Sequence, residues 1–429
     1  MSETAGSIAG ARRATTARRL IVLAGPAIAV GVGSALLLWT LDRVSEGLHH
    51  VLWDVLPGAF GFGPDNPFWI FAVLTLTGAA VGATVRFLPG HGGPDSAIGE
   101  LDASPPKLIA LPSLALAVVL GLAGGVSLGP ENPIIGINSA LAVALLARFA
   151  AKVPPTLAAV FAMSATIGAL FGTPVAAALV LTGAVGAIKG EGALWDKLFL
   201  PLAAAASGAI TMKLLGGQGM AFSLPPLGEI DVWDVLLGVV VAVGAALVVV
   251  VGAVLLPIAH RAFRLLRSPL LFTTLGGALL GVLGIIGGPM TMFKGLNETA
   301  ALLSDPGAYS AGQLALFAGV KVLALVIAAA AGFRGGRVFP VVFIGVALGL
   351  LAAALLPGIP LALAVACAAL GATLVATHDG WIALFLAVAL VGDIAVLPLL
   401  CVIILPVWLV VTSAPELIVP PEKGAPAAA

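Results

Sequence analysis

Charged residues are so scarce in this chain that most of its surface has to face something other than water. Of its 429 residues, 20 are basic and 20 are acidic, while 60% are hydrophobic. Soluble domains contain about 25% charged residues, since a hydrated surface needs them. The same composition excludes a disordered chain, and the zero net charge gives no reason to expect a nucleic-acid partner. We therefore predict an all-α polytopic membrane protein in a lipid bilayer, with no nucleic-acid binding.

Apolar segments are separated by short loops and form two groups of six. They cover 20–40, 68–87, 107–124, 134–151, 157–185 and 196–215, then 234–258, 268–287, 312–331, 339–357, 359–377 and 381–412. A straight membrane helix needs about 20 apolar residues. Several segments are shorter, and many are interrupted by members of a set of 54 glycines and 30 prolines. We predict tilted and broken helices, whose exposed backbone has to line a protein cavity.

Two basic clusters indicate how the groups are oriented. Four arginines between residues 12 and 19 precede the first apolar segment, whereas the cluster at 260–267 follows the first segment of the second group. Because basic loops stay on the cytoplasmic side, these two segments run in opposite directions. This predicts two inverted-topology halves, an architecture that places a binding site near the midplane. Two stacked bundles without internal symmetry remain the alternative.

The expected organisation follows from these clusters and from a Gly- and Pro-rich stretch. Residues 1–19 form a cytoplasmic N-terminal tail, 20–215 a first membrane half, 216–232 a linker loop, 233–418 a second membrane half and 419–429 a disordered tail. The composition favours a bacterial inner (plasma) membrane. No cofactor is expected. Cys367 and Cys401 match no metal motif, and five histidines without ligand spacing argue against a metal site or a membrane enzyme.

Glu131 stands out because ionisable residues inside membrane segments are functional candidates. It follows the helix-stopping pair Gly129-Pro130, and Asn132-Pro133 is typical of a helix start. Such an end has unpaired N–H groups and the positive end of the helix dipole, and it attracts an anion. The Glu131 carboxylate could fill that site itself and leave when a mobile anion competes. A simple cap of its own helix is an equally good interpretation.

Two other stretches have related features. Gly335-Gly336-Arg337-Val338-Phe339-Pro340 precedes an apolar run, and its glycines let the backbone approach a bound ion. Gly90-His91-Gly92-Gly93-Pro94 follows the second apolar segment, where His91 is either an anion donor or a loop histidine in water. Lys321 lies in an apolar segment, where we expect it to snorkel or to pair.

In order and spacing these three stretches resemble the motifs of the CLC family of chloride channels and chloride/proton antiporters. The first family motif, Gly-Ser-Gly-Ile-Pro, is similar to residues 90–94. The second, Gly-Lys/Arg-Glu-Gly-Pro, is similar to residues 129–133, and the third, Gly-x-Phe-x-Pro, is similar to residues 336–340. The likeness covers roughly residues 20–415, with no motif intact.

The resemblance implies a voltage-gated-type chloride channel that is a homodimer with one anion pathway per subunit. Glu131 would be the gating glutamate. The anion would be held by His91, Gly92, Glu131, Asn132, Arg337, Val338 and Phe339. Backbone N–H groups bind chloride without the full charge that would slow its exit. The expected substrates are chloride and other small monovalent anions.

Several positions depart from the family pattern. His91 stands where the family has an anion-coordinating serine, Val338 replaces a phenylalanine, and Pro130 replaces a basic residue. Arg337 is basic at the pseudo-equivalent place in the other half, so the charge has either moved across the pseudo-two-fold axis or belongs to an aqueous vestibule. Leu417 falls near the position of the family's central tyrosine.

The transport mode depends on a missing carboxylate. The antiporters' inner proton-relay glutamate would fall near Gly183-Ala184, where the sequence reads Leu-Thr-Gly-Ala-Val. Passive conduction is therefore the favoured mode. A proton-coupled chloride or fluoride antiporter is the alternative, with Glu191 as a substitute relay.

Overall fold

The computed structural model describes residues 2–63, 65–98, 105–187, 194–217, 222, 224–228 and 231–420. Within these residues the chain is helical, and one isolated two-residue bridge is its sole β pairing. The predicted all-α fold is confirmed. The candidate relay Glu191, residues 218–221, 223, 229 and 230 of the predicted linker, and the last nine residues lie outside the described residues.

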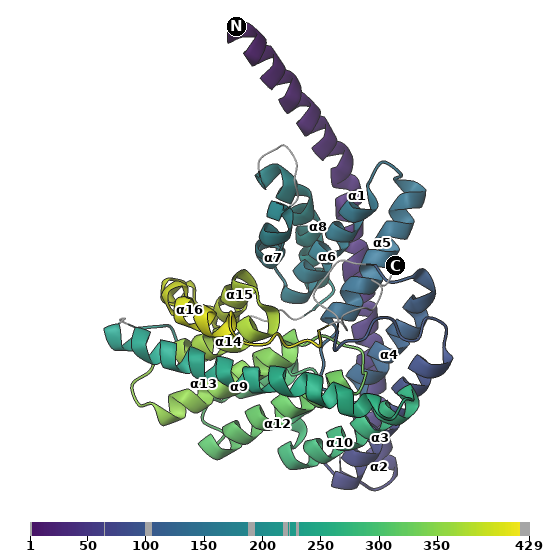
Figure 1. Cartoon of the computed structure of the whole chain (residues 1–429), viewed down its shortest axis with the longest axis vertical. Helices are drawn as coiled ribbons and strands as arrows, with labels where there is room; N and C mark the ends of the chain where they lie inside the picture. The colour runs from purple at the N-terminus through teal and green to yellow at the C-terminus, as the bar shows by residue number, and fades with distance from the viewer. Residues whose placement is uncertain are drawn as a thin grey trace. The chain divides into compact units, whose positions relative to one another are not determined.

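Sixteen α-helices make up most of the described chain (Figure 1). They are α1 (Ser2–His50), α2 (Leu56–Ala59), α3 (Pro67–Phe87), α4 (Leu111–Ala123), α5 (Glu131–Phe149), α6 (Pro155–Phe171), α7 (Pro174–Ala187), α8 (Leu194–Leu214), α9 (Val232–Arg264), α10 (Pro269–Gly287), α11 (Leu296–Ser304), α12 (Ala311–Ala330), α13 (Val338–Leu355), α14 (Leu361–Thr377), α15 (Gly380–Val391) and α16 (Leu397–Val411). Single turns η1 (Val51–Val55), η2 (Leu108–Ala110), η3 (Pro289–Thr291) and η4 (Ile394–Val396) extend or join them.

One boundary differs from the sequence prediction, and one of the predicted helix breaks is observed. The first helix begins at Ser2, well before the apolar segment at residue 20, and residues 2–19 contain no proline that would stop it. The apolar run 157–185 is two helices, since Gly172 adopts a left-handed conformation (φ 73°) and ends α6 before Pro174 starts α7.

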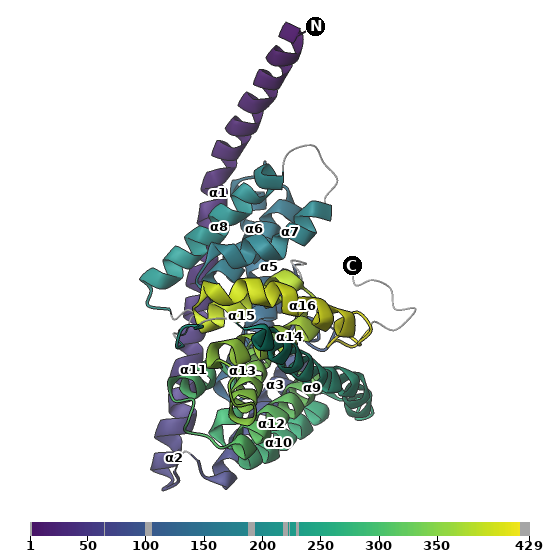
Figure 2. The ribbon, with the colours of Figure 1, turned by 90° about the vertical axis from the view of Figure 1, so that its left-hand side faces the viewer.

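The chain divides into two compact units. Unit 1 contains residues up to Thr40 and residues from Ile134 to Gly219, which include most of α5 and all of α6, α7 and α8. In this unit α6, α7 and α8 lie side by side (Figure 2). Its core is apolar, and Phe161 and Ala204 at its centre are fully buried.

Unit 2 contains residues 41–102, 106–133 and 220–429 and holds the candidate site. Here α3 packs along α10, and α13 packs between α12 and α14. Small residues allow these close approaches: Gly78 and Gly277 face each other across α3 and α10, where an added Cβ on either would reach the other helix's backbone. α14 is almost entirely buried, and α13 is buried from Val338 to Ala347, so the N-terminal end of α13 lies in the interior of the unit.

Nine helices in the described part of the chain are long and apolar enough to cross a membrane. Four further apolar helices, including α4 and α14, are shorter. The predicted mixture of full-length and short membrane helices is thus observed. It leaves helix ends such as those of α4, α5 and α13 inside the protein, where unpaired backbone groups can face a ligand.

Candidate anion site

Two loops in unit 2 meet immediately before helix N-termini. Gly129 N–H donates to Gly336 C=O (2.8 Å) and Gly336 N–H donates to Gly129 C=O (2.6 Å). The first loop leads from α4 into α5, and the second leads from α12 into α13. This antiparallel pairing relates helix–loop–helix segments from the two halves of the sequence. It brings together two of the motifs that sequence analysis singled out, although they are about 200 residues apart in the chain.

Glycine leaves room at this pairing, where a carboxylate lies against the backbone. A Cβ added to Gly336 would be 2.9 Å from Oε1 of Glu131. A Cβ added to Gly335 would be 2.9 Å from Gly129 C=O. Contacts under 3.0 Å to a carbon force one partner to move. The two glycines therefore allow the backbones and the Glu131 carboxylate to share one small space.

The Glu131 carboxylate occupies the N-terminal end of α13. Phe339 N–H donates to Glu131 Oε1 at 3.1 Å, and the N–H groups of Val338 and of Glu131 itself also act on the carboxylate. Glu131 is 1% exposed. Oε2 makes no hydrogen bond with any described residue. A helix N-terminus stabilises negative charge, so the gate candidate fills the kind of position that a free anion would take.

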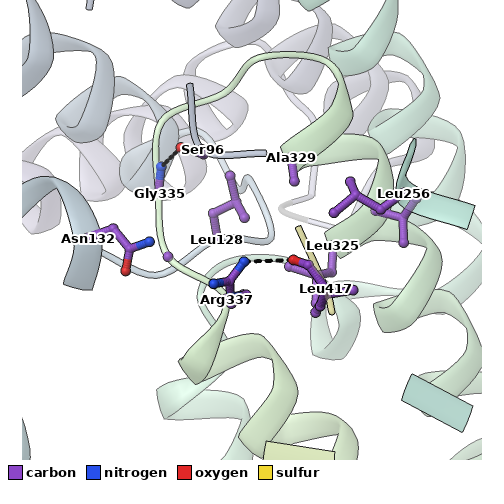
Figure 3. A pocket seen from close by; sticks show the side chains of 11 residues that line it. Ser96, Leu128, Asn132, Leu256, Leu325, Ala329, Gly335, Arg337 and Leu417 are labelled. Atoms are coloured by element: carbon purple, nitrogen blue, oxygen red, sulfur yellow. Dashed lines mark hydrogen bonds between the residues drawn. The ribbon is translucent and has the colours of Figure 1, made fainter. Parts of the chain in front are cut away.

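A pocket next to this carboxylate opens between the two loops and the C-terminal segment (Figure 3). Polar atoms come from Ser96, Asn132 and Arg337, and Leu128, Leu256, Leu325, Val326 and Ala329 supply apolar walls. Arg337 Nη1 donates to the backbone C=O of Leu417 at 2.7 Å, so the guanidinium is directed at the C-terminal segment (Figure 3). Gly335 N–H donates to Ser96 Oγ at 2.8 Å. Donors on one side and aliphatic groups on the other suit a small anion that has lost part of its water.

Comparison with known proteins agrees with this architecture. A family model described as voltage gated chloride channel matches residues 73–410. Proteins named YfeO from Escherichia coli, Escherichia fergusonii and Shigella boydii are each 45% identical over 410 residues, covering 96% of this chain and 98% of the relative. Those proteins carry names that describe them as ion-transport proteins.

The chain belongs to the CLC family.

Solved CLC structures have the same fold. A CLC-type fluoride/proton antiporter superposes with a TM-score of 0.69 at 18% identity, covering 92% of this chain and 98% of that structure. A slow cyanobacterial chloride/proton antiporter gives 0.77 at 16% identity, covering 91% and 95%. The predicted CLC resemblance and fold class are therefore confirmed. As a CLC protein, the chain is a multi-pass membrane protein of a family that transports small anions and contains ion channels and transporters.

The structure of this CLC protein brings some predicted site residues together. Asn132, Arg337 and Leu417 line one pocket, and Glu131, Val338 and Phe339 meet at the adjoining helix end. Their roles in transport stay predictions.

His91 and Gly92 lie elsewhere. His91 is exposed, its backbone is left-handed (φ 52°), and its Nδ1 is 3.0 Å from Val85 C=O at the end of α3. Gly92 N–H donates to Ser113 Oγ (3.1 Å) and so does not point into the pocket. Ser96, five residues beyond His91, reaches the pocket instead. The motif alignment indicated the loop but not the residue, since this loop turns through consecutive left-handed positions at 90–93.

A charged cluster that sequence analysis missed fixes that loop. The buried Arg334 donates from Nε to Gly92 C=O (2.8 Å) and from Nη2 to His91 C=O (3.2 Å), and its Nη1 is 3.7 Å from Asp95 Oδ1. Asp95 also binds Arg264 and His260 of α9. Burial disfavours ionisation of Asp95, but the hydrogen bond to His260 and the charges of Arg334 and Arg264 outweigh it, so the pKa of Asp95 is lowered.

Lys321 neither snorkels nor reaches the surface. It is fully buried in α12, and its Nζ donates to the carbonyls of Met292 (2.6 Å), Phe293 (2.8 Å) and Thr291 (3.3 Å). Its ammonium also lies 5.0 Å from the centre of the Phe343 ring. The expected pairing is thus made with backbone oxygens, and it anchors the loop between α10 and α11. A lone lysine in an apolar run gives no sequence signal for such distant partners.

Proposed function

We propose that this CLC protein is a chloride channel for small monovalent anions, gated by Glu131. One observation carries the proposal: the Glu131 carboxylate accepts a hydrogen bond from Phe339 N–H at the start of α13, next to a pocket with anion-binding groups. An ionised carboxylate there excludes a mobile anion by occupying its place and by repulsion. The pathway conducts when an anion displaces the carboxylate or a proton neutralises it. Arg337, Asn132 and Ser96 then line the route to the helix end.

Passive conduction is the proposed mode because no carboxylate occurs among residues 181–185, where the antiporters of the family have their inner relay. The solved structures that this chain resembles include a fluoride/proton and a chloride/proton antiporter, so proton-coupled exchange is the second candidate. It is supported by the same buried Glu131, which could carry a proton as well as block an anion. We further propose a homodimer in a bacterial inner membrane with the N-terminus in the cytoplasm, as the arginines near the first span favour.

Chloride efflux from proteoliposomes containing the purified protein, recorded with a chloride electrode and a pH electrode, tests the proposal. We expect chloride to leave when a potassium ionophore balances charge, with no proton uptake in fixed proportion. A fixed proton-to-chloride ratio, or proton pumping driven by a chloride gradient, would favour the antiporter. Parallel runs with fluoride and nitrate give the selectivity. The absence of flux with all three ions would refute both candidates.

A further inference from the structure

The loop between η3 and α11 brings Lys294 beside the gate. Phe293 N–H donates to Gly125 C=O (3.0 Å), which ties this loop to the one that leads to Glu131. On the other side of Lys294, a Cβ added to Gly295 would be 3.5 Å from Phe339 C=O. Phe339 is the donor that holds the Glu131 carboxylate. Lys294 therefore lies between two backbone contacts with the segments that form the gate, and its charge acts on Glu131.

The backbone of this loop is held firmly. Lys321 binds three consecutive carbonyls, at residues 291, 292 and 293. Phe293 has a left-handed conformation (φ 56°), and its ring packs against His49 and Trp53 with centroid distances of 4.8 and 5.5 Å. A fixed backbone leaves the long Lys294 side chain as the part of the loop that can change partner.

The present partner of Lys294 is held loosely. Its Nζ is 3.4 Å from Asp42 Oδ1, and the two side chains are 25% and 26% exposed. A partly exposed ion pair at this distance contributes little to stability, about 0–1 kcal/mol. Glu298, in the first turn of α11, is a second nearby carboxylate, on which the charge of Lys321 acts more strongly than that of Lys294. Glu131 Oε2, in contrast, is buried with no hydrogen-bond partner among the described residues.

We propose that Lys294 receives the Glu131 carboxylate in the conducting state. When an anion takes the N-terminal end of α13, Glu131 leaves the Phe339 N–H and pairs with Lys294, which leaves Asp42. Lys294 pairs with one carboxylate in each state, so the Glu131 carboxylate can move without being left unpaired in the protein interior. The inference rests on Glu131 being the gate. It makes Lys294 a positioning residue, with Asp42 and Glu298 as competing anions and Lys321 as the fixed neighbouring cation.

Lys294→Gln in two backgrounds tests the exchange. With Glu131 present, we expect chloride efflux from proteoliposomes at pH 7.5 to fall about tenfold, since one hydrogen bond between charged groups is lost in the open state alone. In Glu131→Gln protein, the same substitution is expected to leave flux unchanged, because the neutral amide needs no cation. Asp42→Asn should raise flux in otherwise wild-type protein, since it releases Lys294 for Glu131. Lys294→Arg, which keeps the charge, should retain most of the flux.

Each alternative gives a different result. An equal loss of flux from Lys294→Gln in both backgrounds would show that Lys294 only attracts anions to the pathway, and would overturn the exchange. Unchanged flux with Glu131 present would overturn it as well. If Glu131→Gln alone leaves the rate and its pH dependence as in wild type, the gate itself is refuted, which is a separate outcome. Thermal unfolding of each variant in detergent identifies a loss of flux that comes from misfolding. If Lys294→Gln is misfolded, Lys294→Arg decides whether a positive charge at this position supports the flux.

Discussion

Glu131→Gln is the sharpest test of the gate, because the side chain keeps its shape while its charge is removed. In the closed arrangement Oε1 accepts from Phe339 N–H at 3.1 Å. A hydrogen bond to a charged group contributes about 1 kcal/mol more than one to a neutral group. The interaction of the carboxylate with the N-terminal end of α13 adds about 1 kcal/mol at such a buried site. The closed state should therefore lose about 2 kcal/mol, a factor of about 30 in its occupancy. The proposed pairing of Glu131 with Lys294 in the open state, a factor of about ten, is lost as well, so the net shift toward the open state is about threefold.

The assay is chloride efflux from proteoliposomes over a range of external pH. Proton binding to Glu131 should change the flux in the same direction as the substitution, since both remove the negative charge that holds the side chain on the helix end. Wild-type flux should thus rise as the external pH falls, whereas Glu131→Gln flux should be high and flat. The matched control is Glu46→Gln, which removes an exposed carboxylate paired with Arg43 in α1 and should keep the wild-type profile. A Glu131→Gln protein that does not conduct, or that keeps the wild-type pH slope, would refute the reasoning.

Four further outcomes follow from the same contacts. Asp95→Asn should lower the free energy of unfolding at pH 7 by about 2 kcal/mol. Because the pKa of Asp95 is lowered on folding, the difference between the two proteins should disappear as the pH falls below the ordinary value of 3.8. Thermal unfolding across pH measures this difference. Lys321→Met should cost about 3 kcal/mol by leaving loop carbonyls unpaired, seen as a lower unfolding temperature. Gly295→Ala, at φ 96°, should lower the free energy of unfolding by about 1–3 kcal/mol. Gly312→Ala is the control: at this exposed position of α12 no atom lies within 4 Å of the added Cβ, so the unfolding temperature should stay the same or rise slightly. Arg337→Gln should reduce anion flux and affinity about tenfold, and unchanged values in both would show that its charge does not serve the pathway.

The sequence was most informative where chemistry is rare. A single acid between a helix-stopping and a helix-starting pair indicated Glu131. The structure places its side chain at the N-terminal end of another helix, α13, which also follows a glycine pair. The Gly335–Pro340 stretch likewise leads into a helix, which begins at Val338 and has Pro340 in its first turn, where a proline is tolerated. Helix limits were partly predictable. Glycine and proline inside the apolar run 157–185 indicate the break between α6 and α7, whereas nothing in the polar N-terminal stretch indicates a helix that begins at Ser2.

The residues that were missed share a physical reason. Ser96, Lys294 and Arg334 act through partners that are distant in sequence, and their own surroundings look like ordinary loops. Arg334 lies 242 residues from the Gly92 carbonyl that it binds, and Lys294 lies 252 residues from Asp42. Such pairs form because folding brings together segments that are far apart in the sequence, and no local pattern encodes them. In a membrane chain with few charges, the sequence therefore indicates which charged residues serve function or hold loops in place. Their partners are identified only from the folded structure.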